Sequence, residues 1–242
     1  MRICKYLLAL TLLLFSCDMM AQQEMPFISP TATFINSAGE EEESTSYSGS
    51  APVKAIFRAN PSNIGSYYPY YEWRFYKEGE GSVESEKEPY LIRYEEETEY
   101  TFKEAGSHRV ACYASFVNGV DTIAYDDVES FTISISESKL EMPNAFSPNG
   151  DDINDTYKVK EYQSLIEFHA YIFNRWGQKL YEWDNPAAEG WDGKYHGRDV
   201  KQGVYYCLVK AKGADGRKFT IRKDVNLLRG YTEKSGATGG DQ

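Results

Sequence analysis

The sequence has very little of the chemistry that catalytic and metal-binding sites use. Its 242 residues include only three histidines, His108, His169 and His196, and four cysteines. No histidine belongs to an H-E-x-x-H motif, and neither G-x-S-x-G nor C-x-x-C is present. We therefore expect no catalytic residues, no zinc site and a protein that is not an enzyme.

Sustained helical periodicity is also missing, whereas residues that favour strands are abundant. The chain contains 20 Tyr and 12 Phe, and 41% of its residues are apolar. Aromatic residues fit pleated, half-buried surfaces, and the strand-like runs are short and separated by Gly, Pro and charged clusters. These features predict an all-β fold of two tandem antiparallel sandwiches, and 242 residues suffice for two small cores.

Residues 1–21 read as an N-terminal signal peptide, with basic Arg2 and Lys5 ahead of a short apolar run. The run is too short for a permanent membrane span. Two processing sites remain open: cleavage after Ala21, or lipid attachment at Cys17, the lipidation candidate. Either route takes the protein out of the cytoplasm into the cell envelope, at the outer membrane or cell surface, and the second adds a lipid anchor.

The mature chain keeps two cysteines inside strand-like segments, Cys112 in "VACYASFV" and Cys207 in "VYYCLVK". Alternation places Val110, Cys112, Ala114 and Phe116 on one face of a strand. We expect buried free thiols, with a disulfide between the two domains as the alternative.

Charge divides the chain into two parts. Residues 22–137 carry 21 acidic and 8 basic side chains, whereas residues 138–242 carry 15 acidic and 16 basic ones. The resulting organisation is a flexible segment over 22–52, a sandwich over 53–137, a second sandwich over 138–229 and a disordered tail over 230–242. Because the net charge is −11, we expect no nucleic-acid partner.

The loop "NAFSPNGDDINDTY", residues 144–157, is rich in Asn and Asp. Asn149, Asp151 and Asp155 offer oxygen atoms at spacings that Ca²⁺ accepts, which makes them a weak calcium site. The other interpretation is a turn in which these oxygens accept backbone N–H groups. The turn is preferred, so the expected cofactor is none, with Ca²⁺ as the alternative.

Two further patterns concern binding and hairpins. Six aromatic residues form either a sugar-binding platform or, by alternation, partly a core: Tyr67, Tyr68, Tyr70, Tyr71, Trp73 and Tyr76. In the second half, strand patterns flank 174–177 and 213–216, and both stretches are expected to be hairpin turns that need Gly.

The second half resembles the gliding-motility-associated C-terminal domain, the type B sorting domain of the type IX secretion system. Four segments carry the resemblance in order: "PNAFSPNGDDINDTYKV", "IFNRWGQKLYEW", "WDGKYHGRDVKQGVYYCLVK" and "VNLLR". It implies an Ig-like sandwich that directs export and engages an outer-membrane β-barrel of the PorP/SprF type or another secretion component. Whether the domain is cleaved or permanent stays open, because 13 residues follow the Leu-Arg.

The first half is similar to PKD-type Ig-like sandwiches through "YYEWRFY" and "YTFKEAGSHRVACYASFVNG". With so little chain ahead of the sorting-type domain, the whole resembles the short PorA-like envelope component. The resemblance implies a non-enzymatic interaction protein of the secretion and gliding machinery. The alternative is an adhesin that binds a cell-surface glycan through its PKD-like domain.

The basic hairpin near the end of the second domain is the candidate docking surface. We expect it to supply charge complementarity to the partner, with edge strands adding backbone pairing. The partner-binding candidates are Lys210, Lys212, Arg217, Lys218, Arg222 and Lys223.

Overall fold

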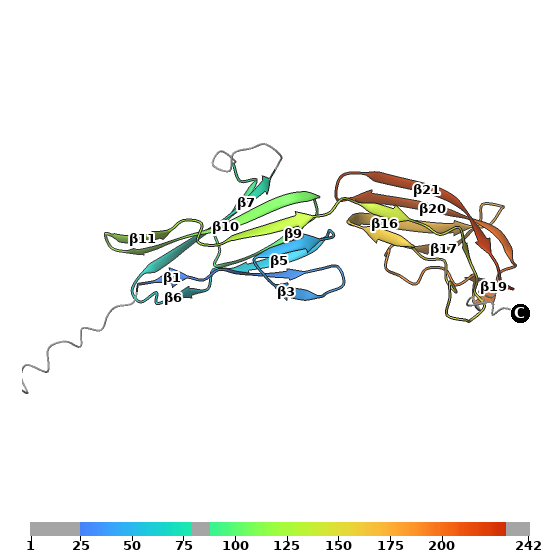
Figure 1. Ribbon diagram of the computed structural model, residues 1–242, viewed down its shortest axis with the longest axis horizontal. Coiled ribbons are helices and arrows are strands. Elements are labelled where there is room, and N and C mark those ends of the chain that lie inside the picture. The colour runs from blue at the N-terminus through green and yellow to red at the C-terminus, as the bar shows by residue number, and fades with distance from the viewer. Residues whose placement is uncertain (1–24, 79–87, 231–242) are drawn as a thin grey trace, which may run out of the picture.

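The computed structural model describes residues 25–78 and 88–230, and it shows two β-sandwiches arranged end to end (Figure 1). Every regular element in those ranges is a strand, which confirms the predicted all-β class with Ig-like antiparallel sandwiches. No helix within those ranges is long and apolar enough to cross a membrane. The predicted leader, Cys17 and all of the tail except Gly230 lie outside the described residues.

Two sheets face each other in the first sandwich, and their inward side chains form its core. One sheet has the order β3 (Glu41–Glu43), β2 (Thr31–Ile35), β5 (Val53–Arg58) and β9 (Glu97–Phe102). The other has the order β4 (Ser46–Gly49), β12 (Ser130–Ile135), β10 (Gly106–Asn118), β7 (Tyr68–Glu78) and β8 (Leu91–Arg93), with β11 (Asp121–Tyr125) paired to β10. The short strands β1 (Phe27–Ile28) and β6 (Pro61–Ser62) pair with each other.

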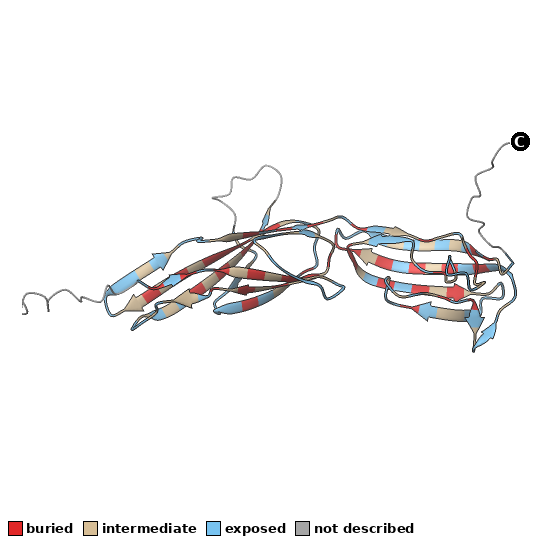
Figure 2. Ribbon diagram, turned by 60° about the horizontal axis from the view of Figure 1, so that its bottom comes forward, coloured by how far each residue is buried: buried red, intermediate tan, exposed pale blue. Residues whose placement is uncertain are grey.

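Aromatic rings fill the space between these sheets. Phe57 from β5 contacts Trp73 and Phe75 of β7 and Phe131 of β12, with ring centroids 5.5–5.8 Å apart. Buried and exposed residues alternate along the strands, as the period of two requires (Figure 2). Such rings contribute more than their buried area alone because tilted and edge-on contacts are favourable.

The prediction of a flexible segment over 22–52 was wrong for its described part. Strand β2 buries Ala32 and Phe34, and Phe34 stacks on Tyr47 of β4 at 5.3 Å. Strand β3 is all glutamate, yet it pairs with β2 as an edge strand whose side chains stay in water. Composition therefore misled the prediction, because backbone pairing needs no apolar side chain.

The second sandwich is built on one five-stranded sheet. Its order is β14 (Ala145–Phe146), β21 (Lys218–Leu227), β20 (Gly203–Gly213), β16 (Leu165–Phe173) and β17 (Lys179–Trp183). Two short pairs accompany it, β13 (Lys139–Glu141) with β15 (Glu161–Gln163) and β18 (Lys194–Tyr195) with β19 (Arg198–Asp199). Both predicted hairpins are confirmed, and Gly177 and Gly216 have φ near +80° in their turns.

The core of the second sandwich centres on Trp191. Its ring lies 5.3 Å from that of Phe146 and 5.0 Å from that of Tyr205, and its indole N–H donates to the carbonyl of Lys194 at 2.8 Å. Arg229, just beyond β21, donates to the carbonyl of Gly193 at 2.7 Å. The aromatic residues and the Leu-Arg segment at the end of this half therefore pack around the same core.

The two cysteines lie in separate cores as free thiols, so the predicted buried thiols are confirmed and the alternative disulfide is not formed. Burial raises the pKa of Cys112 to about 12 and that of Cys207 to about 11. Both thiols are therefore protonated at neutral pH and unreactive.

The tip of the β20–β21 hairpin packs against the first sandwich. Ala214 belongs to the buried cluster of that sandwich, and its carbonyl accepts a hydrogen bond from the N–H of Ala105 at 3.0 Å. Ser164 is 1% exposed, and its hydroxyl accepts from the N–H of Ala51 at 3.2 Å and contacts the hydroxyl of Ser136 at 2.8 Å. Both sandwiches thus share hydrogen bonds and apolar contacts at their junction.

Asp215 fixes the connecting segment at this junction. Its carboxylate accepts from the hydroxyl of Ser138 at 2.7 Å and from the backbone N–H of Ser138 at 3.1 Å. These hydrogen bonds, with that from the Arg217 N–H, lower the pKa of Asp215 to about 2. Position 213 beside this contact must be glycine, because a Cβ there would lie 2.1 Å from the Ser138 hydroxyl oxygen.

Candidate interaction surfaces

The outer face of the five-stranded sheet gathers four of the six predicted partner-binding residues. Lys210 is paired with Thr220, Lys212 with Lys218, and Leu208 with Arg222, across β20 and β21. Because alternate residues point the same way, Lys210, Lys212, Lys218 and Arg222 share the face that the core does not use.

Three of these cations are not in an ion pair with any described residue, although Asp224 follows two residues after Arg222 on the same face of β21. Lys210, Lys218 and Arg222 form no ion pair within the described ranges, whereas Lys212 lies 4.0 Å from Glu167. A cation without an intramolecular partner keeps its full electrostatic attraction for an acidic partner surface.

The other two predicted residues make contacts within the chain. Arg217 donates to the carbonyl of Ser138 at 3.4 Å and lies 4.0 Å from Glu137, at the junction of the sandwiches. The ammonium of Lys223 points to the opposite side of β21 and donates to the carbonyl of Met142. The sequence had placed all six together because it shows the hairpin, but not which neighbours approach each side chain.

An apolar strip lies on the same outer face, towards the far end of the sheet. Tyr206 is 43% exposed and Val204 is 48% exposed. Together with Phe173, Leu208 and Arg222, Tyr206 lines a hollow of about 320 Å³. The face therefore combines unpaired positive charge with accessible apolar surface, a combination typical of protein–protein contacts.

Trp176 adds a second apolar feature that the sequence-based prediction missed. It occupies the tip of the β16–β17 hairpin, is 76% exposed, and has the guanidinium of Arg175 4.4 Å from its ring centre. Asn174 fixes the turn, because its side-chain oxygen accepts the N–H groups of Trp176 and Gln178 at 3.0 Å. A groove of about 660 Å³ runs from this tip to Val204.

The Asn- and Asp-rich loop forms a hydrogen-bonded turn. The carboxylate of Asp155 accepts the backbone N–H groups of Asn149, Gly150 and Asp152 at 2.7–2.8 Å. Asp151 accepts the N–H of Ile153 at 3.0 Å. No group of three or more His, Cys, Asp or Glu side chains suited to a metal ion occurs among the described residues. The calcium alternative at Asn149, Asp151 and Asp155 stays a prediction.

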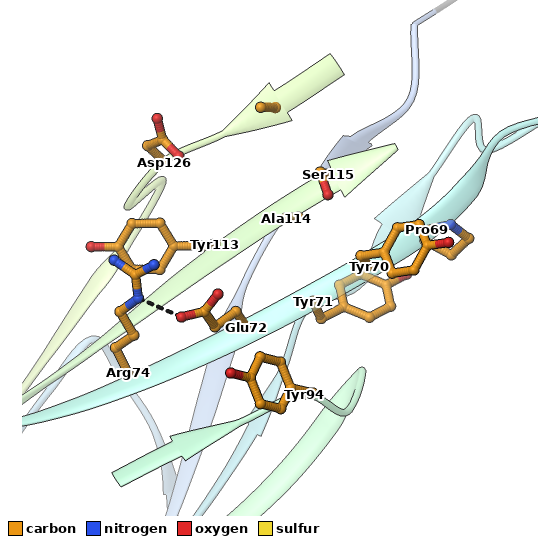
Figure 3. A pocket seen from close by; sticks show the side chains of 11 residues that line it. Pro69, Tyr70, Tyr71, Glu72, Arg74, Tyr94, Tyr113, Ala114, Ser115 and Asp126 are labelled. Carbon is orange, nitrogen blue, oxygen red and sulfur yellow. Dashed lines mark hydrogen bonds and ion pairs between the residues drawn. The ribbon is translucent and has the colours of Figure 1, made fainter. Parts of the chain in front are cut away.

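The aromatic run of β7 divides between the core and the surface. Tyr71, Trp73 and Tyr76 are buried, whereas Tyr68 and Tyr70 are 73% and 61% exposed. Tyr70 lines a groove on the outer face of the first sandwich, whose lining residues are shown in Figure 3. His108, by contrast, is 3% exposed and packs edge-on against Phe102.

Comparison with known proteins identifies the second sandwich. Residues 140–222 match the sequence model of the CHU_C Type IX secretion signal domain. The matched residues coincide with strands β13 to β21, of which the last continues to Leu227. A type IX secretion signal domain implies a secreted or cell-surface protein with a role connected to type IX secretion.

Other comparisons add little. No curated protein matches the chain. The chain is similar to a solved structure of dimeric latent PorU from Porphyromonas gingivalis, with 11% sequence identity and a TM-score of 0.25 over 86% of this chain. It spans 20% of the length of that protein.

The hydrogen bonds of Asp155 predict a pH-dependent loss of stability in Asp155→Asn. Its pKa is lowered because the carboxylate accepts the N–H of Gly150 and then those of Asp152 and Asn149. The folded-state pKa lies below the unfolded value of about 3.9, so this stabilisation is present above that pH and is lost as pH falls through the folded pKa. Urea denaturation at pH 7 should give a lower midpoint for the variant, and the difference should shrink below about pH 4.

Asp152→Asn is the matched control, because Asp152 has φ +63°, which Asn tolerates. It should unfold like the unaltered protein. Equal midpoints for the two variants would contradict the assigned role of Asp155. Millimolar Ca²⁺ should shift neither midpoint, and a rise that Asp155→Asn abolishes would instead establish the calcium site.

Proposed function

We propose that this protein is a non-enzymatic cell-envelope interaction protein that the type IX secretion machinery exports and holds at the outer membrane. The observation that carries this proposal is the match of residues 140–222 to a type IX secretion signal domain, which here is a complete folded sandwich. We also propose a role in gliding, because the second half resembles the gliding-motility-associated C-terminal domain.

The burial of His108 and of both described cysteines supports a binding role over a catalytic one. Of the three histidines, His108 is buried against Phe102 and Tyr90, and burial lowers its pKa. The two cysteines are protonated inside their cores. His108 and both thiols therefore serve in packing, and none of the three is exposed as a nucleophile or base.

The outer face of the five-stranded sheet is the proposed docking surface for a barrel of the PorP/SprF type. Lys210, Lys218 and Arg222 supply charge, while Tyr206 and Val204 supply apolar contact. This combination fits a partner surface that has an acidic rim around an apolar centre. The edge strand β17 lies on the same sheet and offers unpaired backbone groups.

Export should depend on the second sandwich. We expect the full protein to reach the cell surface or medium, and a truncation that ends at residue 137 to stay in the periplasm. Residues 138–242 attached to a periplasmic fluorescent protein should carry it to the surface. Cell fractionation with protease protection measures both, in a type IX-competent bacterium and an isogenic strain that lacks the apparatus.

The control fusion carries residues 22–137 and should remain periplasmic. Surface delivery of the truncation, or unchanged delivery in the strain without the apparatus, would contradict the proposed route.

Charge reversal on the outer face should weaken docking. We expect Lys210→Glu, Lys218→Glu and Arg222→Glu together to reduce recovery of the barrel in crosslinked pull-downs by about tenfold, since like charges would replace complementary ones. The reduction should be smaller at high salt, because screening weakens the contribution that the cations make.

The matched control reverses three exposed lysines of the same domain that lie off this face, Lys139, Lys158 and Lys160. Each of them already forms a surface ion pair with a glutamate. Equal recovery with both triple variants would remove the outer face from the docking surface while leaving the export route intact.

A further inference from the structure

The groove of the first sandwich crosses three neighbouring strands on the sheet's outer face. Tyr113 on β10 is paired with Glu72 on β7, and Ser115 is paired with Tyr70 on β7 and with Ala124 on β11. The groove thus extends over two strand spacings, about 10 Å, before it reaches Tyr94 beyond β8. Its volume is about 420 Å³, within the range of small-molecule and cofactor sites.

Two of the tyrosines that line the groove present free rings. Tyr70 is 61% exposed and Tyr94 is 70% exposed. Neither has a ring contact or side-chain hydrogen bond to another residue in the described part of the chain. Large exposed rings with a polar tip are typical of recognition surfaces, because they add contact area at low conformational cost.

The polar groups of the groove are already arranged and partly neutralised. Arg74 donates to the carboxylate of Glu72 at 2.6 Å, and its guanidinium lies 4.0 Å from the ring centre of Tyr113. In Figure 3, Glu72 lies among the lining residues, with Tyr113 and Asp126 on one side of it and Tyr94 on the other. The groove therefore presents carboxylate acceptors, guanidinium donors and a phenol hydroxyl that can do both.

This set of groups discriminates among ligand classes. An anionic ligand would meet Glu72 and Asp126 against the single cation Arg74. A cationic ligand would be repelled by Arg74. It also could not stack on Tyr113, because the guanidinium of Arg74 already covers that ring. A proline-rich peptide offers acceptors but few donors, so the two carboxylates would lose water without gaining a partner.

We propose that this groove binds a neutral oligosaccharide, with sugar rings on Tyr70 and Tyr94 and sugar hydroxyls hydrogen-bonded to Glu72, Arg74 and Asp126. Hydroxyl groups both donate and accept, so they satisfy the mixed set of polar atoms without adding charge. The first sandwich is then a recognition module carried by the exported chain. The groove lies outside residues 140–222, so its role is independent of the export route.

Binding is measured by isothermal titration of the purified protein with neutral hexasaccharides of glucose, mannose, xylose and N-acetylglucosamine. An oligogalacturonate, choline and a proline-rich decapeptide represent the anionic, cationic and peptide classes that the groove should not bind. At least one neutral hexasaccharide should bind, and Tyr70→Ala and Tyr94→Ala should each weaken it about tenfold, as expected for loss of a stacked ring.

Tyr68→Ala is the matched control, since Tyr68 is 73% exposed on the same strand but does not line the groove. Tyr68→Ala should bind the sugar as tightly as the unaltered protein does. All three variants should have the thermal unfolding midpoint of the unaltered protein, because the replaced rings are exposed. Failure of every neutral hexasaccharide to bind would overturn the proposal. So would binding of only an excluded class, or neutral binding that Tyr68→Ala weakens as much as Tyr70→Ala.

Discussion

The carboxylate of Asp215 and the hydroxyl of Ser164 are the polar contacts on which the arrangement of the two sandwiches depends. Asp215 holds the connecting segment at Ser138, and Ser164 contacts Ala51 and Ser136 of the first sandwich. The hydroxyls of Ser138 and Ser164 are both buried. Breaking either hydrogen bond would therefore cost more free energy than breaking one at the surface, because the buried group would be left without a partner. The tip of the β20–β21 hairpin at Ala214 adds apolar contact beside them. Two domains joined in this way present their surfaces in a fixed relation.

That relation matters because the sandwiches differ in charge and in the surfaces they present. The first carries most of the negative charge and has a groove lined by tyrosines on its outer face. The second carries the unpaired cations Lys210, Lys218 and Arg222 beside an apolar strip. A docked second domain would therefore hold the groove of the first at a defined position on the cell surface.

The sequence predicted the fold class and both hairpins of the second half because period-two alternation and turn glycines are local signals. It failed over residues 25–52, the described part of the segment predicted to be flexible, where the charged strand β3 is held by backbone pairing. The partner-binding role of the six basic residues stays a prediction. The hydrogen bonds of Arg217 and Lys223 could not be predicted, because their partners, Ser138 and Met142, lie about 80 residues away in sequence.

Sequence reasoning missed two parts of the candidate surfaces, and only the first of them had a signal in the sequence. Trp176 stands in a turn next to Gly177, and a large apolar residue in a turn is itself an indication of exposure. The groove of the first sandwich unites Tyr94 with Tyr113 through strand pairing over long sequence separation. No local pattern encodes that meeting, because it depends on which strands are neighbours.

The fixed relation of the two sandwiches is the central claim, and a distance measurement between them tests it most directly. Spin labels at Val120→Cys, 99% exposed in the first sandwich, and Glu189→Cys, whose side chain is 83% exposed in the second, suit pulsed dipolar spectroscopy. The labelled protein begins after residue 21, and its native thiols, Cys112 and Cys207, are buried and should stay unlabelled. We predict one narrow distance distribution that broadens in Asp215→Ala. A broad or two-peaked distribution in the otherwise unaltered protein would contradict the claim.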